Sequence, residues 1–286
     1  SDYRADVRVS KEIFKQLTQN YLKFRNTAKF CLDNLTDFDP NQLTAPADME
    51  ALDRWAITKL NELLVKCEAA YQNYEFLTVS HAVNDFCVVT LSSLYLDIIK
   101  DRLYCADEHA RRCAQTALYR ILVDFTKLVA PILCFTAQEI WSYIPKLEGM
   151  QEYVCWERMP EAKSDEDAAF DAKWAKIIAV RDDVKKVLEQ ARADKTIGSS
   201  LEAAVTLYCS DEMYDFLNAI PMDELADLMI VSHVDLVKGE GGVKGLTEGL
   251  GMSVAHAAGN KCLRCWKFDT AVGEDGLCPR CAKVLG

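Results

Sequence analysis

The sequence predicts a mainly α-helical protein, in which a helix bundle is followed by a small α+β unit and a C-terminal ribbon built around four cysteines. Three observations support this fold class. Apolar residues recur at spacings of three and four through the first 146 residues, strand-like alternation begins only after about residue 200, and two C-x2-C pairs lie near the end. With 286 residues, about two domains are expected. We place the boundaries at 1–146, 147–238 and 239–286.

The first 146 residues contain five amphipathic stretches, each predicted to form a helix. Ser10 can cap the first, and its apolar stripe consists of Ile13, Leu17, Tyr21, Phe24, Ala28 and Cys31. Further stripes run over residues 52–70, 76–104 and 110–128, the last ending near Pro131. Residues 136–139 match a capping box that opens a short helix ending at Pro145. Amphipathic helices cannot each bury a stripe alone, so we expect a helix bundle.

Beyond residue 147 the pattern changes to that of a small α+β unit. Residues 152–156 are predicted to be extended, 160–167 form an acidic linker, and 173–193 carry a helical pattern. Strands are expected at 201–208, 229–231 and 234–237. Residues 239–251 hold six glycines in 13 positions, which indicates a flexible tether or loop.

The formal net charge of −11 is unevenly distributed along the chain. Residues 147–236 hold 9 Lys/Arg against 20 Asp/Glu, whereas residues 1–31 hold 7 against 3. The overall sign argues against a sheath of basic surface for nucleic acid. A basic patch near the N-terminal end remains compatible with the sequence.

Composition indicates a reducing, cytoplasmic interior without a membrane. No apolar run approaches the roughly 20 residues that cross a bilayer, and no basic n-region or apolar core marks a signal peptide. Eight of the twelve cysteines are scattered singly, mostly within apolar helical patterns, where a free thiol packs as a small hydrophobe. The chain starts without Met, so we expect it to be a piece of something longer.

The strongest chemical signal is a pair of C-x2-C motifs, Cys262 with Cys265 and Cys278 with Cys281, separated by twelve residues. Two such knuckles can arrange four sulfurs as a tetrahedron around one zinc ion. A terminal unit of about 30 residues is too small to fold by apolar burial alone, so structural Zn2+ would supply its stability. Iron, two disulfides or idle thiols are alternatives. Four thiolates leave no open position for a catalytic water.

Nothing in the sequence reads as a catalytic site. A Walker loop, GxSxG and HExxH are absent, and the four histidines stand apart from any obvious nucleophile. Trp266, directly after Cys265, either packs over the metal or offers an exposed stacking face. The sequence alone favours the packed position, although aromatic faces beside Arg and Lys are what single-stranded nucleic acid uses.

Six motifs in order nevertheless resemble one family, the bacterial isoleucyl-tRNA synthetases, over nearly the whole chain. The motifs lie at residues 6–10 (DVRVS), 21–30 (YLKFRNTAKF), 52–55 (LDRW), 95–104 (YLDIIKDRLY), 130–141 (APILCFTAQEIW) and 197–203 (IGSSLEA). The terminal four-cysteine ribbon with Arg264, Cys265 and Trp266 also favours the isoleucine member. The family's HIGH and KMSKS signatures, which belong to ATP-dependent adenylate formation, occur nowhere here, nor does its editing domain.

The resemblance implies that the bundle holds the anticodon stem-loop of an isoleucine tRNA and that the zinc ribbon completes the grip. This chain should then bind tRNA without aminoacylating it, as a monomer joined to an upstream catalytic domain that uses ATP. Seven residues are candidate RNA contacts: Arg25, Lys29, Lys100, Arg102, Arg264, Trp266 and Lys267. Each basic one could instead lie on a solvated helix face or pair with a nearby acid such as Asp97 or Asp101.

Two other functions remain open at this point. The acidic segment and the ribbon could form a zinc-stabilised structural or protein-interaction module that contacts RNA little. The four cysteines alone would also suit a thiol or iron electron carrier.

Overall fold

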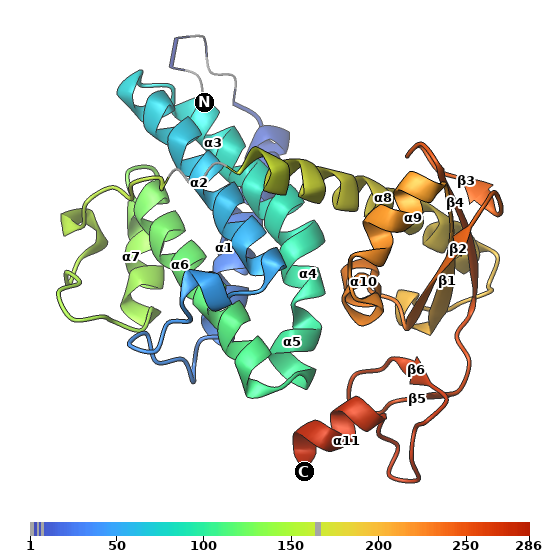
Figure 1. Ribbon diagram of the computed structural model, residues 1–286. Helices are drawn as coiled ribbons and strands as arrows, with labels where there is room; N and C mark the ends of the chain where they lie inside the picture. Colours follow the sequence, from blue (N-terminus) through green and yellow to red (C-terminus); the bar gives the residue numbers. More distant parts are fainter. Residues whose placement is uncertain (1–2, 5, 7–8, 164–166) are drawn as a thin grey trace. The chain divides into compact units, whose positions relative to one another are not determined.

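The computed structural model describes residues 3–4, 6, 9–163 and 167–286. The chain divides into two compact units, Ser1–Leu103 with Asp107–Glu166, and Tyr104–Ala106 with Asp167–Gly286 (Figure 1). Val7 and Arg8 of the first motif, and residues 164–166 of the expected acidic linker, lie outside the described residues.

The first unit is a helix bundle, as predicted. Its elements are α1 (Lys11–Asp33), α2 (Ala51–Gln72), α3 (Phe76–Asp85), a π-helical stretch (Phe86–Tyr95), α4 (Leu96–Ile98), α5 (Lys100–Cys105), α6 (Glu108–Val129) and α7 (Cys134–Tyr143). α2 packs against α3 and α6, and α1 packs against α3, α6 and α7. The apolar stripes meet in a core that contains Phe24, Leu60, Phe125 and Trp141.

Two helix starts were predicted from capping residues, with different outcomes. Ser10 caps α1, because its Oγ accepts a hydrogen bond from the N–H of Ile13 at 3.2 Å. The capping box at 136–139 is wrong, because α7 begins at Cys134 after Leu133 and has no side-chain cap. Thr136 lies inside the helix, and its hydroxyl lies 3.2 Å from that of Tyr21 on α1.

The segment after α7 packs on the bundle, so the first unit extends to residue 166 rather than to the expected boundary at 146. The indole N–H of Trp141 donates to the carbonyl of Gln151 at 3.0 Å. The N–H of Val154 donates to Gln138 Oε1 at 2.9 Å, and Lys127 forms an ion pair with Glu157 at 3.1 Å. Residues 154–156 form a 3-10 turn where extended chain was expected.

Among the described residues, one helical stretch, Phe76–Cys105, is long and apolar enough by composition to cross a membrane. Within this stretch, 56% of an apolar 18-residue segment is buried inside the protein. The stretch therefore has the character of a core helix.

The second unit contains the α+β part and the ribbon. Its elements are α8 (Ala168–Ala193), β1 (Ala203–Cys209), α9 (Asp211–Asn218), α10 (Met222–Met229), β2 (His233–Lys238), β3 (Val243–Lys244), β4 (Leu250–His256), β5 (Asn260–Lys261), β6 (Phe268–Asp269) and α11 (Pro279–Leu285). The main sheet has the order β2-β1-β4-β3, with β2 parallel and β4 antiparallel to β1.

The predicted alternation of β1 is confirmed, because every second residue from Ala203 to Cys209 is buried. The expected strand at 229–231 is wrong. Those residues end α10, which terminates at Ile230 in the left-handed conformation with φ 56°. The chain therefore enters β2 only at His233.

The glycine-rich segment is not a tether, because it forms β3, its loop and the start of β4. A Cβ at Gly242 would lie 2.2 Å from the carbonyl oxygen of Met252, and one at Gly251 would lie 2.1 Å from that of Gly241. The glycines thus let two stretches of main chain approach closely. Asp183 on α8 fastens the loop, because its carboxylate accepts the N–H of Thr247 at 2.8 Å.

Candidate metal centre and nucleic-acid interface

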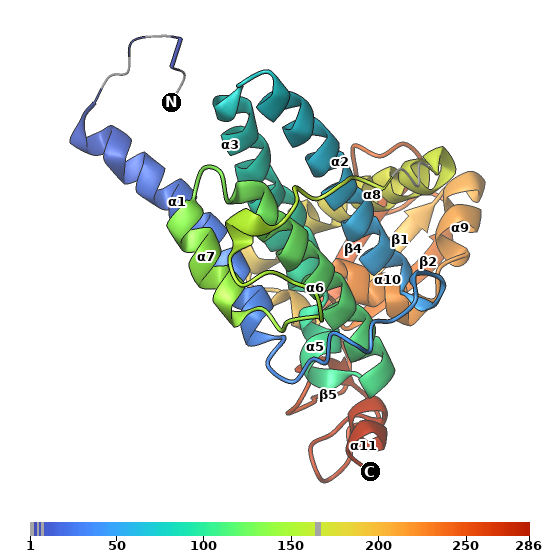
Figure 2. The same ribbon diagram turned by 90° about the vertical axis from the view of Figure 1, so that its left-hand side faces the viewer.

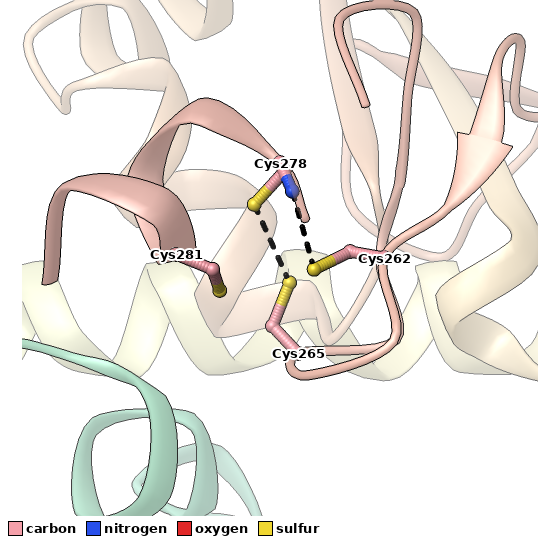
Figure 3. Close-up of side chains that lie close together, drawn as sticks. All are labelled: Cys262, Cys265, Cys278 and Cys281. Atoms are coloured by element: carbon pink, nitrogen blue, oxygen red, sulfur yellow. Dashed lines mark hydrogen bonds between the residues drawn. The ribbon is translucent and has the colours of Figure 1, made fainter. Parts of the chain in front are cut away.

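The four terminal cysteines converge on one point (Figure 3). Cys262 and Cys265 come from the turn after β5, and Cys278 and Cys281 from the start of α11. All four are buried, and their sulfurs lie within 4.8 Å of one another. A tetrahedron with Zn–S bonds of about 2.3 Å has edges of about 3.8 Å. The Cys265 and Cys278 sulfurs are 3.8 Å apart, so the donor set suits a tetrahedral ion.

The main chain of the first knuckle favours a thiolate at Cys262. Burial opposes ionisation of this thiol, but N–H groups of Cys265, Cys278 and Arg264 outweigh it and lower the pKa of Cys262 to about 6. By contrast, burial raises the pKa of Cys265 to about 12. Burial also raises the pKa of Cys281. The Cys262 thiol therefore ionises readily, whereas Cys265 and Cys281 need a neighbouring cation to do so, which a metal ion provides.

The disulfide alternative does not agree with this geometry. A disulfide requires sulfurs about 2.05 Å apart, whereas the two that approach at 3.8 Å remain free thiols. The spacing of four sulfurs suits zinc and iron equally well, so the choice of metal depends on other findings.

The ribbon is held to the α+β part of its own unit by polar contacts. Lys267 forms an ion pair with Asp227 of α10, and the N–H of Phe268 donates to Ser232 Oγ at 2.7 Å. The guanidinium of Arg264 donates to the carbonyls of Cys105 at 3.0 Å and Tyr104 at 3.4 Å, in the short segment that groups with this unit. Arg264 and Lys267 therefore have structural partners.

Trp266 is 59% exposed, so the packed position that the sequence favoured is wrong. Its backbone has φ 66°, in the left-handed region, which turns the chain immediately after the knuckle. Lys261 Nζ lies 5.5 Å from the centre of the indole ring. An exposed aromatic face with an ammonium group beside it can stack on a base and contact its phosphate.

In the first unit, Arg25 and Lys29 lie on one wall of a cavity of about 420 Å³ between α1 and α7. Both side chains are exposed, as expected for residues four apart on one helix face. Lys29 pairs with Asp33 at 2.7 Å, whereas among the described residues no carboxylate pairs with Arg25. The opposite wall includes Tyr143, which is 70% exposed.

Sequence reasoning missed Tyr143 as a candidate. Its signal was available, because it lies four residues after Glu139 and so extends one face of α7 beyond the motif at 130–141. That face looks toward α1 across the cavity.

The remaining two candidate RNA contacts, Lys100 and Arg102, form ion pairs within the bundle. Lys100 is exposed and pairs with Asp97 at 2.8 Å. Arg102 is 9% exposed and binds the fully buried Asp53 through both terminal nitrogens, at 2.8 and 2.7 Å. Arg102 is thus a core residue, and its assignment to RNA contact is corrected, because reaching a phosphate would leave a buried carboxylate unpaired.

Comparison with known families defines the class of protein. Residues 53–207 match the model of the anticodon-binding domain of tRNA ligase, and residues 259–284 match the zinc finger found in FPG and IleRS. The chain belongs to the family of tRNA-ligase anticodon-binding domains. The zinc-finger match, together with the four-sulfur cluster, identifies the metal as structural zinc.

The chain is similar over its whole length to isoleucine–tRNA ligases of bacteria. The chain is 44% identical to the one from Desulfitobacterium hafniense, 45% to that of Geobacter sulfurreducens and 45% to that of Bacillus mycoides. The alignments cover 99–100% of this chain but only 32% of each relative, at the C-terminal part. The chain thus spans about a third of the length of the relatives that it matches.

Proposed function

We propose that this chain binds the anticodon loop of an isoleucine-accepting tRNA, as the C-terminal part of an isoleucine–tRNA ligase. The anticodon loop is single-stranded, so its bases can be stacked and hydrogen-bonded along their edges. Two surfaces offer such contacts. The α1–α7 cavity combines Arg25 and Lys29 with the exposed ring of Tyr143, and the ribbon presents Trp266 beside Lys261.

The observation that carries this proposal is Arg25. Arg25 is exposed, pairs with no carboxylate among the described residues, and lines a cavity that also has an exposed phenol, so its guanidinium can bind a ligand there. Phosphates and unstacked bases are the ligands in RNA that such a site accommodates.

The zinc site has a supporting role in this function. The thiolates of Cys262, Cys265, Cys278 and Cys281 would hold Zn2+ and fold the ribbon, which positions Trp266. We assign aminoacylation and the use of ATP to the remaining part of such a ligase, because HIGH and KMSKS are absent from these residues. We infer a cytoplasmic location and a monomeric state for the chain.

One observation favours a second function, a zinc-stabilised module that binds protein rather than RNA. Two of the basic residues predicted to contact RNA, Arg264 and Lys267, are engaged in holding the ribbon. If this use of charge extends to the whole chain, tRNA affinity will be weak and insensitive to salt. The electron-carrier alternative is tested separately by metal analysis. One zinc ion per chain in a colourless protein would exclude an iron electron carrier.

The proposal is tested by titrating fluorescently labelled isoleucine tRNA with the zinc-loaded chain at several salt concentrations. Arg25→Ala is expected to weaken binding and to lower the slope of log K against log salt by about 0.7, the value for one single-strand phosphate. Trp266→Ala is expected to weaken binding by about 1–3 kcal/mol if the indole stacks on a base. Trp156→Ala is the matched control, because that indole is also exposed, at 62%, but lies outside both surfaces.

Two results would contradict the proposal. One is the absence of measurable affinity for isoleucine tRNA at low salt. The other is an equal loss of affinity in the Trp156 and Trp266 variants, because a generally sticky aromatic surface would give that pattern.

A further inference from the structure

The buried cluster around the metal centre contains a fifth cysteine. Among the described residues, Cys105 packs with Cys262, Cys265, Cys278 and Cys281 and is 7% exposed. It is the last residue of α5, and it groups with the same compact unit as the ribbon. β5 and α11, which adjoin the two knuckles, lie close together in both views (Figures 1 and 2). A tetrahedral site uses four sulfurs, so Cys105 lies outside the set that would bind the metal.

Cys105 is held beside the first knuckle by reciprocal hydrogen bonds with Arg264. The Cys105 thiol donates to the carbonyl of Arg264 at 3.5 Å, and the Arg264 guanidinium donates to the carbonyl of Cys105 at 3.0 Å. Arg264 directly precedes Cys265 in the sequence. The two hydrogen bonds therefore hold the Cys105 sulfur next to the stretch of main chain that carries Cys265.

Cys265 is the metal ligand that a small oxidant should reach first. When it is bound to zinc, its sulfur is a thiolate, which is the form of cysteine that peroxides oxidise. Cys265 is 7% exposed, whereas Cys262 and Cys281 are fully buried. Cys278 is exposed to a similar extent, at 5%, but the hydrogen bonds described above place Cys105 beside Cys265. An oxidised sulfur at Cys265 would therefore have a thiol next to it.

We propose that Cys105 and Cys265 form a site of reversible oxidation, at which a hydroperoxide converts the two residues into a disulfide. The Cys265 thiolate attacks one oxygen of the hydroperoxide, so an S–O bond forms, the O–O bond breaks, and hydroxide or alkoxide leaves. The Cys105 sulfur then attacks the resulting sulfenic acid. An S–S bond forms, the S–O bond breaks, and the hydroxyl group leaves as water with the Cys105 proton. The two sulfurs together lose two electrons, which reduce the peroxide.

The choice of Cys105 as the partner decides how many metal ligands are lost. A disulfide joins sulfurs about 2.05 Å apart, so Cys265 must leave the ion and the Cys105 thiol must leave the Arg264 carbonyl. The competing product joins Cys265 to Cys278, whose sulfurs lie 3.8 Å apart, and would remove two ligands at once. Pairing with Cys105 removes a single ligand and leaves three sulfurs in place. This inference does not depend on RNA binding, because it concerns the metal centre alone.

The test treats the zinc-loaded 286-residue chain with hydrogen peroxide, alkylates the remaining thiols, and follows released zinc with a chromogenic chelator. Peptide mapping without reduction should find Cys105 joined to Cys265, about 2 mass units below the sum of the two thiols. Dithiothreitol should restore both the mass and the bound zinc. Cys105→Ser keeps a donor for the Arg264 carbonyl but cannot form the disulfide. In this variant Cys265 should gain about 32 mass units as sulfinic acid, and the fraction of zinc binding that dithiothreitol restores should fall.

Cys209→Ser is the matched control, because Cys209 is fully buried in β1 of the same unit but lies outside the cysteine cluster. It should behave as the wild type does. Two results would overturn the inference: a wild-type map in which Cys105 is still an alkylated thiol after zinc has been lost, or equal recovery of zinc binding in the wild type and in Cys105→Ser. If that variant binds no zinc before peroxide is added, Cys105→Ala repeats the comparison, and the wild-type map decides the inference by itself.

Discussion

The buried ion pair between Arg102 and Asp53 provides the sharpest prediction. The sequence made Arg102 a candidate RNA contact, whereas in the structure it stabilises the core of the bundle. Asp53 is fully buried and accepts bonds from both terminal nitrogens of Arg102 and from the hydroxyl of Tyr95, the last at 2.8 Å. Glu50 lies 3.1 Å from Arg102 at the rim. The Arg102–Asp53 ion pair joins the start of α2 to α5, and the hydrogen bond from Tyr95 joins it to the end of the π-helical stretch.

Arg102→Met should be strongly destabilising. The substitution leaves the Asp53 carboxylate buried with only the Tyr95 hydroxyl as a donor among the groups described above. Removing one partner of such a pair costs about 3–5 kcal/mol. For a unit of this size, each kcal/mol corresponds to about 2–4 °C, so the thermal midpoint of the bundle should fall by about 6–20 °C. The double variant Asp53→Leu with Arg102→Met should be less damaged than either single one, because no charge is left behind.

Urea unfolding followed by circular dichroism at 222 nm measures the stability, since helices of the bundle dominate that signal. The same variant is then titrated with tRNA at several salt concentrations, under conditions where it is folded. We expect a lower unfolding midpoint and an unchanged salt slope. An unchanged urea midpoint, with the slope of log K against log salt reduced by about 0.7, would show that Arg102 contacts a phosphate. It would also show that the Arg102–Asp53 ion pair contributes little to stability.

Three further predictions concern the second unit. Cys278→Ser should abolish zinc binding and raise amide exchange in residues 259–286 while the bundle keeps its helicity; a collapse of the whole 222 nm signal would contradict this. Burial tends to raise the pKa of Asp183, but hydrogen bonds from Thr247 outweigh it and lower the pKa to about 2. The stabilisation of about 2–3 kcal/mol is therefore present above about pH 5 and lost as the pH falls toward 2. Asp183→Asn should remove that acid dependence from urea midpoints measured between pH 2 and 6. Gly242→Ala should destabilise the sheet by about 1–3 kcal/mol, because φ is 62° and the new Cβ meets the carbonyl of Met252; exchange rates in β4 unchanged from wild type would exclude this.

Features of the fold that depend on residues close together in the sequence could be predicted from the sequence. The bundle followed from helical spacing, the cap of α1 from Ser10, and β1 from its alternation. The metal site followed from cysteine spacing alone, because a knuckle with two residues between sulfurs has few ways to fold around one ion.

Features that depend on partners distant in the sequence were not predictable. Asp53 is 49 residues from Arg102, so the pattern around Arg102 offered Asp97 and Asp101 as its acids instead. The six glycines of 239–251 resembled a tether because flexibility and close approach use the same residue. Only the position of Met252 on β4 shows that close approach is the reason here.

The uneven distribution of charge along the sequence did not predict which charged groups on the surface lack an ion-pair partner. The acidic excess of residues 147–236 was compatible with a module that contacts RNA little. Several of these acids form ion pairs with lysines: Asp227 pairs with Lys267, and Asp211 and Asp215 pair with Lys238. These pairs reduce the free charge of both signs, and a screened surface pair adds little to stability. The groups left to interact with a polyanion are those without such partners, and in the described part of the bundle Arg25 is the clearest of them. Under the proposed function, we expect net charge to set how weakly the chain binds nucleic acid in general. We expect cations that have no ion-pair partner among the described residues and lie near exposed rings, such as Arg25 near Tyr143, to set where it binds.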